Sequence, residues 1–429
     1  MASSTAPVDF PAAIRAAKTE LRTRIGDVRG AFAQVEARMR EEVAAVVAQR
    51  ERGEQVWPVL EFAELDRVTE AQRAAIRRRG CAVIRGTFPR ERAEAWDAEL
   101  VDYLARNDFE GSYRYLDDGV FGGLAAGKPS IFPIYWSGPQ LAARSDPNMA
   151  AVRTFLNGFW RHESEGRVWF DPARDTAYPD RVRRRAPGAS SAGLSPHTDS
   201  GSVERWLLPA YQQVFRHVFS ADPLRYDPWD GAYRTEVHEY PSTVMCSAFR
   251  TFQGWTALSD MAPTEGVLHV VPIPSAMAYL LLRALQDDVP EDDLCGAANG
   301  QALPISERWH SLLLPALTPI PAVEPGDTVW WHGDLIHSVG PVTGQRGWAN
   351  VMYIPAGPHC PKNAEYAARC GQAFLTGASP ADFAAEDYET TWTGRPGLAE
   401  LNPLGRKQLG LGQGVSAGSR PREPRRFGR

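Results

Sequence analysis

The chain has 429 residues, of which 43% are hydrophobic and 23% are charged, and its formal net charge is −5 at pH 7. These values are ordinary for a globular protein with a substantial core, organised as one large domain with additions or as two domains. The small negative charge gives no reason to expect a nucleic acid or an anionic membrane as partner. The N-terminus lacks the apolar stretch of a secretory signal. The sequence also contains no run of about 18 apolar residues, which is the length needed to span a bilayer. We therefore expect a cytoplasmic protein.

The cysteines support the same compartment. Five are present, they are scattered, and no two form a CxxC pair: Cys81, Cys246, Cys295, Cys360 and Cys370. An odd number without such spacing argues against a disulfide framework and against a structural zinc site. We expect small, mostly buried thiols in a reducing environment.

The first 52 residues predict a helical segment. Between residues 11 and 52, apolar side chains recur at steps of three and four, which is typical of one or two amphipathic helices. These helices could form a partner interface, but packing onto the main domain is the favoured interpretation. We take residues 53–403 as that domain.

Further along, the expected elements change in type. Residues 81–86 read as a buried strand after Gly80, a helix is expected near residues 90–107, and the Pro- and aromatic-rich segment 128–136 suggests a loop near a pocket. Beyond residue 206, helices are expected at 206–219 and 275–284, and strands at 243–249, 251–258, 266–272 and 328–331. Helices early and short strands late predict an α+β protein built around a β-barrel or sandwich.

The C-terminal segment, residues 404–429, is rich in Gly, Ser, Pro and basic residues. Such a composition predicts a disordered basic tail, because it offers little apolar surface to bury. Contact with nucleic acid is conceivable there, but a solubilising role is the simpler interpretation.

The most informative short motif is Ser195-Pro196-His197-Thr198-Asp199-Ser200-Gly201-Ser202. If this piece is extended, the side chains of His197 and Asp199 emerge on one face. One imidazole and one carboxylate are adjacent ligands for a divalent metal, and such a mixed set favours iron(II) over calcium or magnesium. By itself the triplet is weak evidence, since a His hydrogen-bonded to a nearby Asp is a common structural pair.

A second segment, residues 324–340, strengthens the metal interpretation. A Pro-Gly-Asp turn leads into an aromatic strand, and His337 follows a short turn later. Two histidines and one carboxylate leave open positions on iron for a keto acid and for dioxygen. The far carboxylate of 2-oxoglutarate then needs a cation, and Arg346, nine residues beyond His337, offers a planar, permanently charged fork.

The segments HTDSGS (197–202) and GDTVWWHGDLIHSVGPVTGQR (326–346) resemble the iron(II)/2-oxoglutarate oxygenases of the phytanoyl-CoA-hydroxylase type. The intervening WTALSD (255–260) and EGVLHVVP (265–272) also fit that group. Over roughly residues 15–400, the chain looks closer still to the bacterial YbiU-like family, on segments such as PSIFPIYW (129–136) and LNGFW (156–160).

The resemblance implies that His197, Asp199 and His337 bind the metal and that Arg346 binds 2-oxoglutarate. It also implies a double-stranded β-helix, the jelly-roll or cupin-like fold, with the metal at one mouth. The gap of 138 residues between Asp199 and His337 is long for such a barrel. We therefore expect an insertion near residues 206–240, which is a candidate lid.

Two assignments stay open. His332 could replace His337 as the distal ligand, although the two lie five residues apart and would face opposite sides of a continuous strand. Arg250 and Arg205 are the next candidates for the role given to Arg346.

The function expected is oxidation, with hydroxylation favoured, of a small polar metabolite such as an amino-acid or nucleoside derivative. The enzyme would bind iron(II) and consume 2-oxoglutarate and O2, and it would release succinate and CO2. The alternatives are a metal-dependent cupin-like enzyme that does not use 2-oxoglutarate, and a barrel that binds a ligand without turnover.

Overall fold

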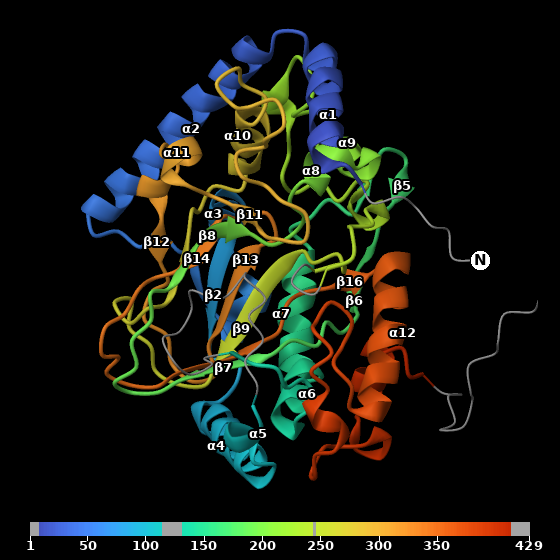
Figure 1. Ribbon diagram of the computed structural model, residues 1–429. Helices are drawn as coiled ribbons and strands as arrows, with labels where there is room; N and C mark the ends of the chain where they lie inside the picture. The colour runs from blue at the N-terminus through green and yellow to red at the C-terminus, as the bar shows by residue number, and fades with distance from the viewer. Residues whose placement is uncertain (1–7, 114–130, 243–245, 413–429) are drawn as a thin grey trace, which may run out of the picture.

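Two antiparallel sheets form the centre of the computed structural model, which describes residues 8–113, 131–242 and 246–412 (Figure 1). The larger sheet has seven strands, in the spatial order β1 (Val59–Glu61), β2 (Cys81–Arg85), β13 (Thr328–His332), β9 (Phe252–Ala257), β15 (Ala349–Tyr353), β7 (Val182–Arg185) and β3 (Ile131–Phe132). The smaller sheet has five, in the order β11 (Leu303–Pro304), β8 (Leu194–Thr198), β14 (His337–Val339), β10 (Leu268–Val270) and β12 (Thr318–Pro319). Only the β1–β2 pair among these is parallel.

The strand β13 shows why the larger sheet is buried on both faces. Val329 and Trp331 point inward and share a cluster with Leu268 and Val270 of the smaller sheet. Trp330, between them, points outward and packs against the helices. This alternation of period two, with apolar residues on both faces, is what a central strand covered on each side requires. The mixed helical and antiparallel-sheet class expected from the sequence is confirmed.

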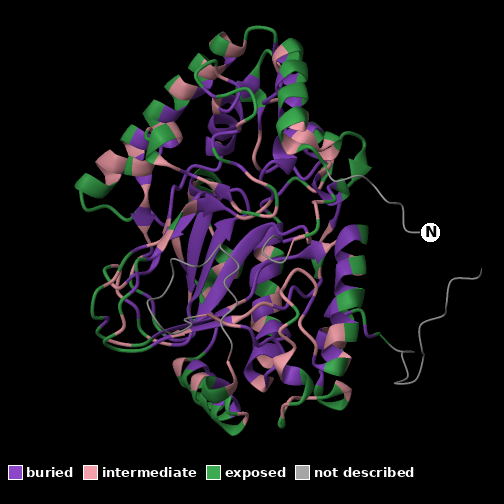
Figure 2. Ribbon diagram, in the orientation of Figure 1, coloured by how far each residue is buried: buried purple, intermediate pink, exposed green. Residues whose placement is uncertain are grey.

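Helices cover the outer face of the larger sheet. They are α3 (Glu70–Arg79), α4 (Arg90–Arg106), α6 (Gly138–Arg144) and α7 (Pro147–Asn157). Buried residues of these helices, such as Trp96 and Leu156, share a cluster with Ile84 and Met352 on the outer face of the sheet. Figure 2 shows the strands as mostly buried and the helices as exposed on their outer sides.

The N-terminal segment forms α1 (Phe10–Ile25) and α2 (Val28–Glu51), capped by Asp9 and Asp27. Both helices pack against the chain around α10 (Ala276–Arg283) in one large apolar cluster. The fully buried Lys18 donates to the carbonyl oxygen of Pro290 at 2.7 Å. Both helices therefore pack against the rest of the chain.

The expected insertion, residues 206–240, contains α8 (Glu204–Leu207), α9 (Pro209–Val214) and the short 3-10 helices Pro223–Arg225 and Arg234–Glu236. Its aromatic residues, including Trp206 and Phe215, are buried in the same cluster as the N-terminal helices. Because these side chains pack against the N-terminal helices, the segment forms an internal layer and not the lid that we expected.

The C-terminal region corrects one predicted boundary. After α12 (Pro361–Thr376), the chain forms α13 (Pro403–Gln408), and Leu409 and Leu411 are buried in the cluster that holds α12. Residues 404–412 are therefore folded, although the sequence assigned them to a basic tail, because those two leucines find an apolar groove. The remainder of the predicted tail, 413–429, lies outside the described residues.

The expected strand at 243–249 is not formed over 246–249, and 243–245 lie outside the described residues. In the described parts of the chain, we find no helix with both the length and the apolarity needed to cross a bilayer. The remaining short elements are α5 (Phe109–Ser112), α11 (Glu307–His310), β4 (Glu163–Ser164), β5 (Arg167–Val168), β6 (Asp171–Asp175) and β16 (Pro358–His359), with 3-10 turns at Phe62–Arg67, Leu314–Ala316, Tyr388–Thr390 and Leu398–Glu400.

Candidate metal centre

The structure brings His197, Asp199 and His337 together on the inner face of the smaller sheet. His197 on β8 lies directly opposite His337 on the neighbouring strand β14, and Asp199 follows the end of β8. The Asp199 carboxylate is 3.2 Å from Nε2 of His197 and 3.3 Å from Nε2 of His337. One ligand atom from each residue lies within 4.8 Å of the other two, so a single metal ion could contact all three.

Both imidazoles are oriented by the backbone. Nδ1 of His197 donates to the carbonyl oxygen of Ser195 at 2.7 Å, and Nδ1 of His337 donates to that of Leu335 at 3.0 Å. These bonds occupy the outer ring nitrogen and leave Nε2 facing Asp199. Metal-binding histidines are commonly held in this way, which fixes both the tautomer and the ring orientation.

A glutamine from the facing sheet supports the carboxylate. Gln253 on β9 is the cross-strand partner of Trp331 on β13. With its amide oriented to satisfy both neighbours, its nitrogen donates to Oδ2 of Asp199 at 2.7 Å, and its oxygen accepts from Nε1 of Trp331 at 3.3 Å. Gln253 was not predicted from the sequence, although its position two residues before Trp255 on an expected strand would have placed it on the inner face.

The charges at the centre favour a cation. Burial opposes ionisation of Asp199, but the imidazoles of His337 and His197 hold the pKa of this carboxyl well below its usual range. Burial alone would lower the pKa of His197, yet the hydrogen bond to Asp199 outweighs it and raises that pKa. Metal ligands must be deprotonated, so a divalent ion at this position would bind the ionised carboxylate and the neutral imidazoles.

His332 does not belong to this centre. Its ring is fully buried and stacks on Trp160, with centroids 4.5 Å apart and an interplanar angle of 8°. Nε2 donates to the carbonyl oxygen of Pro228 at 3.0 Å, while Nδ1 accepts from the backbone N–H of Asp334 at 3.0 Å. With both nitrogens used on the outer side of β13, His332 is a structural residue.

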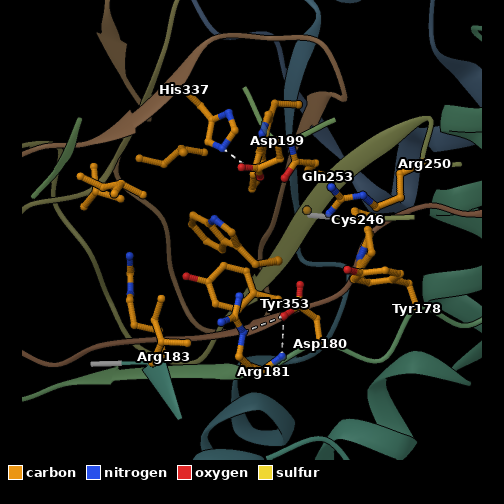
Figure 3. Close-up of a pocket in the computed structure, with 18 of the residues that line it drawn as sticks. Tyr178, Asp180, Arg181, Arg183, Asp199, Cys246, Arg250, Gln253, His337 and Tyr353 are labelled. Carbon is orange, nitrogen blue, oxygen red and sulfur yellow. Dashed lines mark hydrogen bonds and ion pairs between the residues drawn. The ribbon is translucent and has the colours of Figure 1, made fainter. Parts of the chain in front are cut away.

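The three residues line a pocket between the two sheets (Figure 3). Leu194, Leu268 and Val339 of the smaller sheet form an apolar part of its wall, and Trp255 and Trp331 of the larger sheet lie among the residues that line it. Four arginines and several polar residues complete the lining: Arg181, Arg183, Arg185, Arg250, Tyr178, Asp180, Cys246, Tyr353 and Asp382. No residue between 206 and 240 is among the described residues that line it.

Arg346 is not brought to this pocket. It is exposed in the irregular segment between β14 and β15, and it is absent from the described lining. Its neighbour Gln345 is the buried residue there, and the Gln345 side chain accepts from Nε of Arg185. Because no strand sets side-chain direction in this turn, distance along the sequence was a poor guide to which residue faces the pocket.

The two other arginines considered from sequence have different positions. Arg205 is fully buried and pairs with Asp334 at 3.2 Å, outside the described lining of the pocket. Arg250 lines the pocket beside Gln253.

An arginine that the sequence analysis missed, Arg183, faces the same pocket from β7. It alternates with Arg184, which points to the opposite face and pairs with Asp97 at 3.0 Å. Alternation on the strand places Arg183 and Arg185 on the inner face.

A Gig2-like family model matches residues 8–411 of the chain. The chain belongs to the Gig2-like family. The uncharacterised protein YbiU of Escherichia coli (strain K12) is 56% identical over 413 residues, which cover 95% of this chain and 98% of that protein. The YbiU-like resemblance seen in the sequence is thereby confirmed.

Two solved structures show the same architecture over almost the whole chain. A protein of Salmonella typhimurium LT2, provisionally described as an oxidoreductase, is 55% identical with a TM-score of 0.91, covering 95% of this chain and 98% of that one. The GlcNAc Inducible Gene 2 protein of Candida albicans is 25% identical with a TM-score of 0.78, covering 98% of this chain and 93% of that one.

Proposed function

We propose that this member of the Gig2-like family is an iron(II)- and 2-oxoglutarate-dependent oxygenase that hydroxylates a small polar metabolite. The observation that carries the proposal is the convergence of His197, Asp199 and His337, with both Nε2 atoms directed at one carboxylate. Two histidines and one carboxylate on one side of a metal are the ligand set of non-haem iron oxygenases.

The surrounding fold supports the same interpretation. The histidines lie on neighbouring strands of one sheet, and a second antiparallel sheet faces them across the pocket. A double-stranded β-helix of the phytanoyl-CoA-hydroxylase type has two such sheets, with its metal ligands at one end. We therefore propose that fold for the core.

Bound iron would activate O2 for the oxidation of the metabolite. In the overall reaction, 2-oxoglutarate is decarboxylated to succinate and CO2. One oxygen atom of O2 enters succinate, and the other becomes the new hydroxyl of the metabolite. The protein's part is positioning and exclusion of water. Asp199 balances part of the metal's charge, Gln253 holds that carboxylate, and Trp331 packs near His337 with ring centroids 5.5 Å apart.

Since Arg346 is exposed, we propose Arg183 as the residue that binds the far carboxylate of 2-oxoglutarate. Its side chain is 6% exposed and faces the pocket, and Nε has no hydrogen-bond partner in the described structure. The apolar side chains of Leu194, Leu268 and Val339 line the same pocket and suit the two methylene groups of the co-substrate.

A metal-dependent cupin-like enzyme without 2-oxoglutarate remains the alternative, and the buried charge of Arg183 argues against it. Turnover separates the two. Purified protein supplied with iron(II), ascorbate, O2 and 2-oxoglutarate, together with a pool of small metabolites, should form succinate. Asp199→Ala should form none. Iron-loaded protein that neither binds nor consumes 2-oxoglutarate would contradict the proposal.

A further inference from the structure

The pocket contains a second buried arginine whose charge the proposed co-substrate does not use. Arg250 is 9% exposed, and like Arg183 it has a buried Nε without a hydrogen-bond partner. Neither arginine has a carboxylate within ion-pair distance in the described residues. A buried guanidinium without an anionic partner is costly, so its retention beside a pocket points to a ligand.

Three other buried arginines of this fold are paired with carboxylates. Arg153 contacts Asp175 at 2.9 Å, and Arg205 and Arg234 share Asp334 at 3.2 and 2.8 Å. Within the pocket, Arg185 donates to the carbonyl oxygen atoms of residues 265 and 266, at 2.7 and 2.9 Å. Arg181, the fourth arginine of the pocket, pairs with Asp180 at 3.3 Å. Among the arginines that line the pocket, only Arg183 and Arg250 therefore have neither a carboxylate nor a carbonyl partner in the described residues. Arg79 and Arg144 are also buried without an ion pair in the described residues, but they lie outside the lining of the pocket.

The two arginines serve different parts of the pocket. Arg183 comes from β7, whereas Arg250 lies two residues before β9 and three residues before Gln253. Figure 3 shows them on opposite sides of the pocket, with Arg250 on the side of Gln253 and Cys246. One small dicarboxylate that also binds a metal through its keto acid end has a single free carboxylate, so it can satisfy one of them.

The surroundings of Arg250 leave its hydrogen-bonding edge available. The guanidinium carbon lies 5.1 Å from the ring centroid of Tyr178, which itself stacks on Tyr366. Asp382 is in the same wall, but its carboxylate accepts from the N–H and hydroxyl of Ser247, at 2.7 and 2.6 Å. A guanidinium held by an aromatic ring presents a planar fork that matches a carboxylate or a phosphate.

We infer that the metabolite oxidised at this centre carries a small oxyanion, a carboxylate or a phosphate, and that Arg250 binds this group while Arg183 binds 2-oxoglutarate. This inference rests on the proposed function and narrows its substrate class. The anion would anchor one end of the metabolite beside the metal centre and direct the rest of it toward the ligands.

The test uses iron-loaded protein under argon, saturated with 2-oxoglutarate. Probes are inorganic phosphate, with chloride at equal ionic strength as control, and size-matched pairs in which one member is charged: aspartate with asparagine, glutamate with glutamine, and glycerol phosphate with glycerol. Binding of each probe is measured as the rise in the unfolding temperature of the loaded protein. We expect stabilisation by anionic members alone, and the carboxylate and phosphate arms identify which oxyanion is preferred.

Variants then assign the two arginines. Arg250→Gln should weaken binding of the stabilising anion by about 10- to 150-fold, the range for a lost charged contact, while leaving the dissociation constant of 2-oxoglutarate unchanged. Arg250→Lys, which keeps charge but not the fork, should be intermediate. Arg183→Gln should weaken 2-oxoglutarate instead, and the exposed Arg346→Gln is the matched control for loss of one positive charge.

Three results would overturn the inference while the proposed function stands: no anionic probe stabilises the loaded protein, neutral members bind equally well, or Arg250→Gln loses 2-oxoglutarate and keeps the anion. Failure of the iron-loaded wild type to bind 2-oxoglutarate is a different result. It would remove the proposed function and the inference together.

Discussion

Gln253 and Asp199 come from opposite sheets, and their side chains meet across the pocket at 2.7 Å. The amide leaves both carboxylate oxygens within reach of the imidazoles and fixes their direction. We expect Gln253→Leu to weaken iron(II) binding by roughly 10- to 100-fold, which is the usual effect of removing a residue that orients a metal ligand. Metal titration measures this, and Trp331→Phe, which removes the donor to Gln253 but keeps an aromatic ring, should have a smaller effect. Unchanged affinity in a folded Gln253→Leu variant would show that the amide does not orient the carboxylate.

Replacing His337, at the start of β14, and replacing His332, at the end of β13, should have opposite effects on iron binding. His337→Ala should lose iron, because Nε2 of His337 is one of the three proposed ligand atoms. His332→Ala should keep iron but unfold at lower temperature, because it opens a cavity beside Trp160 and leaves the carbonyl of Pro228 without its donor. Metal content and thermal unfolding of both purified variants decide this. Iron retained by the first variant and lost by the second would reverse the assignment.

His332 also predicts how stability depends on pH. Burial lowers the pKa of His332 to about 4 in the folded protein, from an ordinary value near 6.5. Below about pH 6.5 the unfolded chain binds a proton that the folded chain does not, so stability falls as the pH decreases toward about 4. The loss attributable to His332 is on the order of 2–3 kcal/mol. Urea unfolding of metal-free wild type and His332→Gln should show a flatter pH dependence in the variant. Parallel curves would mean that His332 is not the titrating group.

The convergence of His197, Asp199 and His337 was predicted from sequence, and the structure places one ligand atom of each within 4.8 Å of the others. His197 lies in β8 and Asp199 directly follows it, so their common direction is set locally. His332 ends β13 and His337 begins β14, so the break between these strands, rather than parity on one strand, separates the two histidines. Arg346 and Arg183 show where this reasoning ends. Arg346 follows a turn without regular alternation, so its exposure depends on how Gln345 packs against Arg185. Arg183 lies in a basic run, and its burial depends on how the smaller sheet faces β7 across the pocket.

The same reason explains the two other corrections, the expected lid and the start of the expected tail. An aromatic-rich insertion can cover a pocket or fill a core, and the choice at residues 206–240 depends on α1 and α2, which are far away in sequence. The basic composition after residue 404 obscured Leu409 and Leu411, two leucines that find their groove only once α12 has folded.

The C-terminal leucines give a direct test of the corrected boundary. Truncation after Leu404 removes Leu409 and Leu411, which are 2% and 5% exposed, and should cost about 3–6 kcal/mol of stability at 1.5–3 kcal/mol for each buried side chain. Truncation after Gly412 retains both and should leave thermal unfolding unchanged. Equal unfolding temperatures for the two truncated proteins would show that the leucines contribute nothing.

We propose that His197, Asp199 and His337 hold an iron ion to which 2-oxoglutarate binds. Anaerobic calorimetric titration with 2-oxoglutarate tests it most directly, in iron-loaded and metal-free wild type and in Asp199→Ala. Succinate is the control ligand, because it has both carboxylates but no keto oxygen with which to bind the metal. We predict one binding event of 2-oxoglutarate that requires both iron and Asp199, and much weaker binding of succinate. Binding of 2-oxoglutarate that is equally strong without iron, or unchanged in Asp199→Ala, would contradict the account.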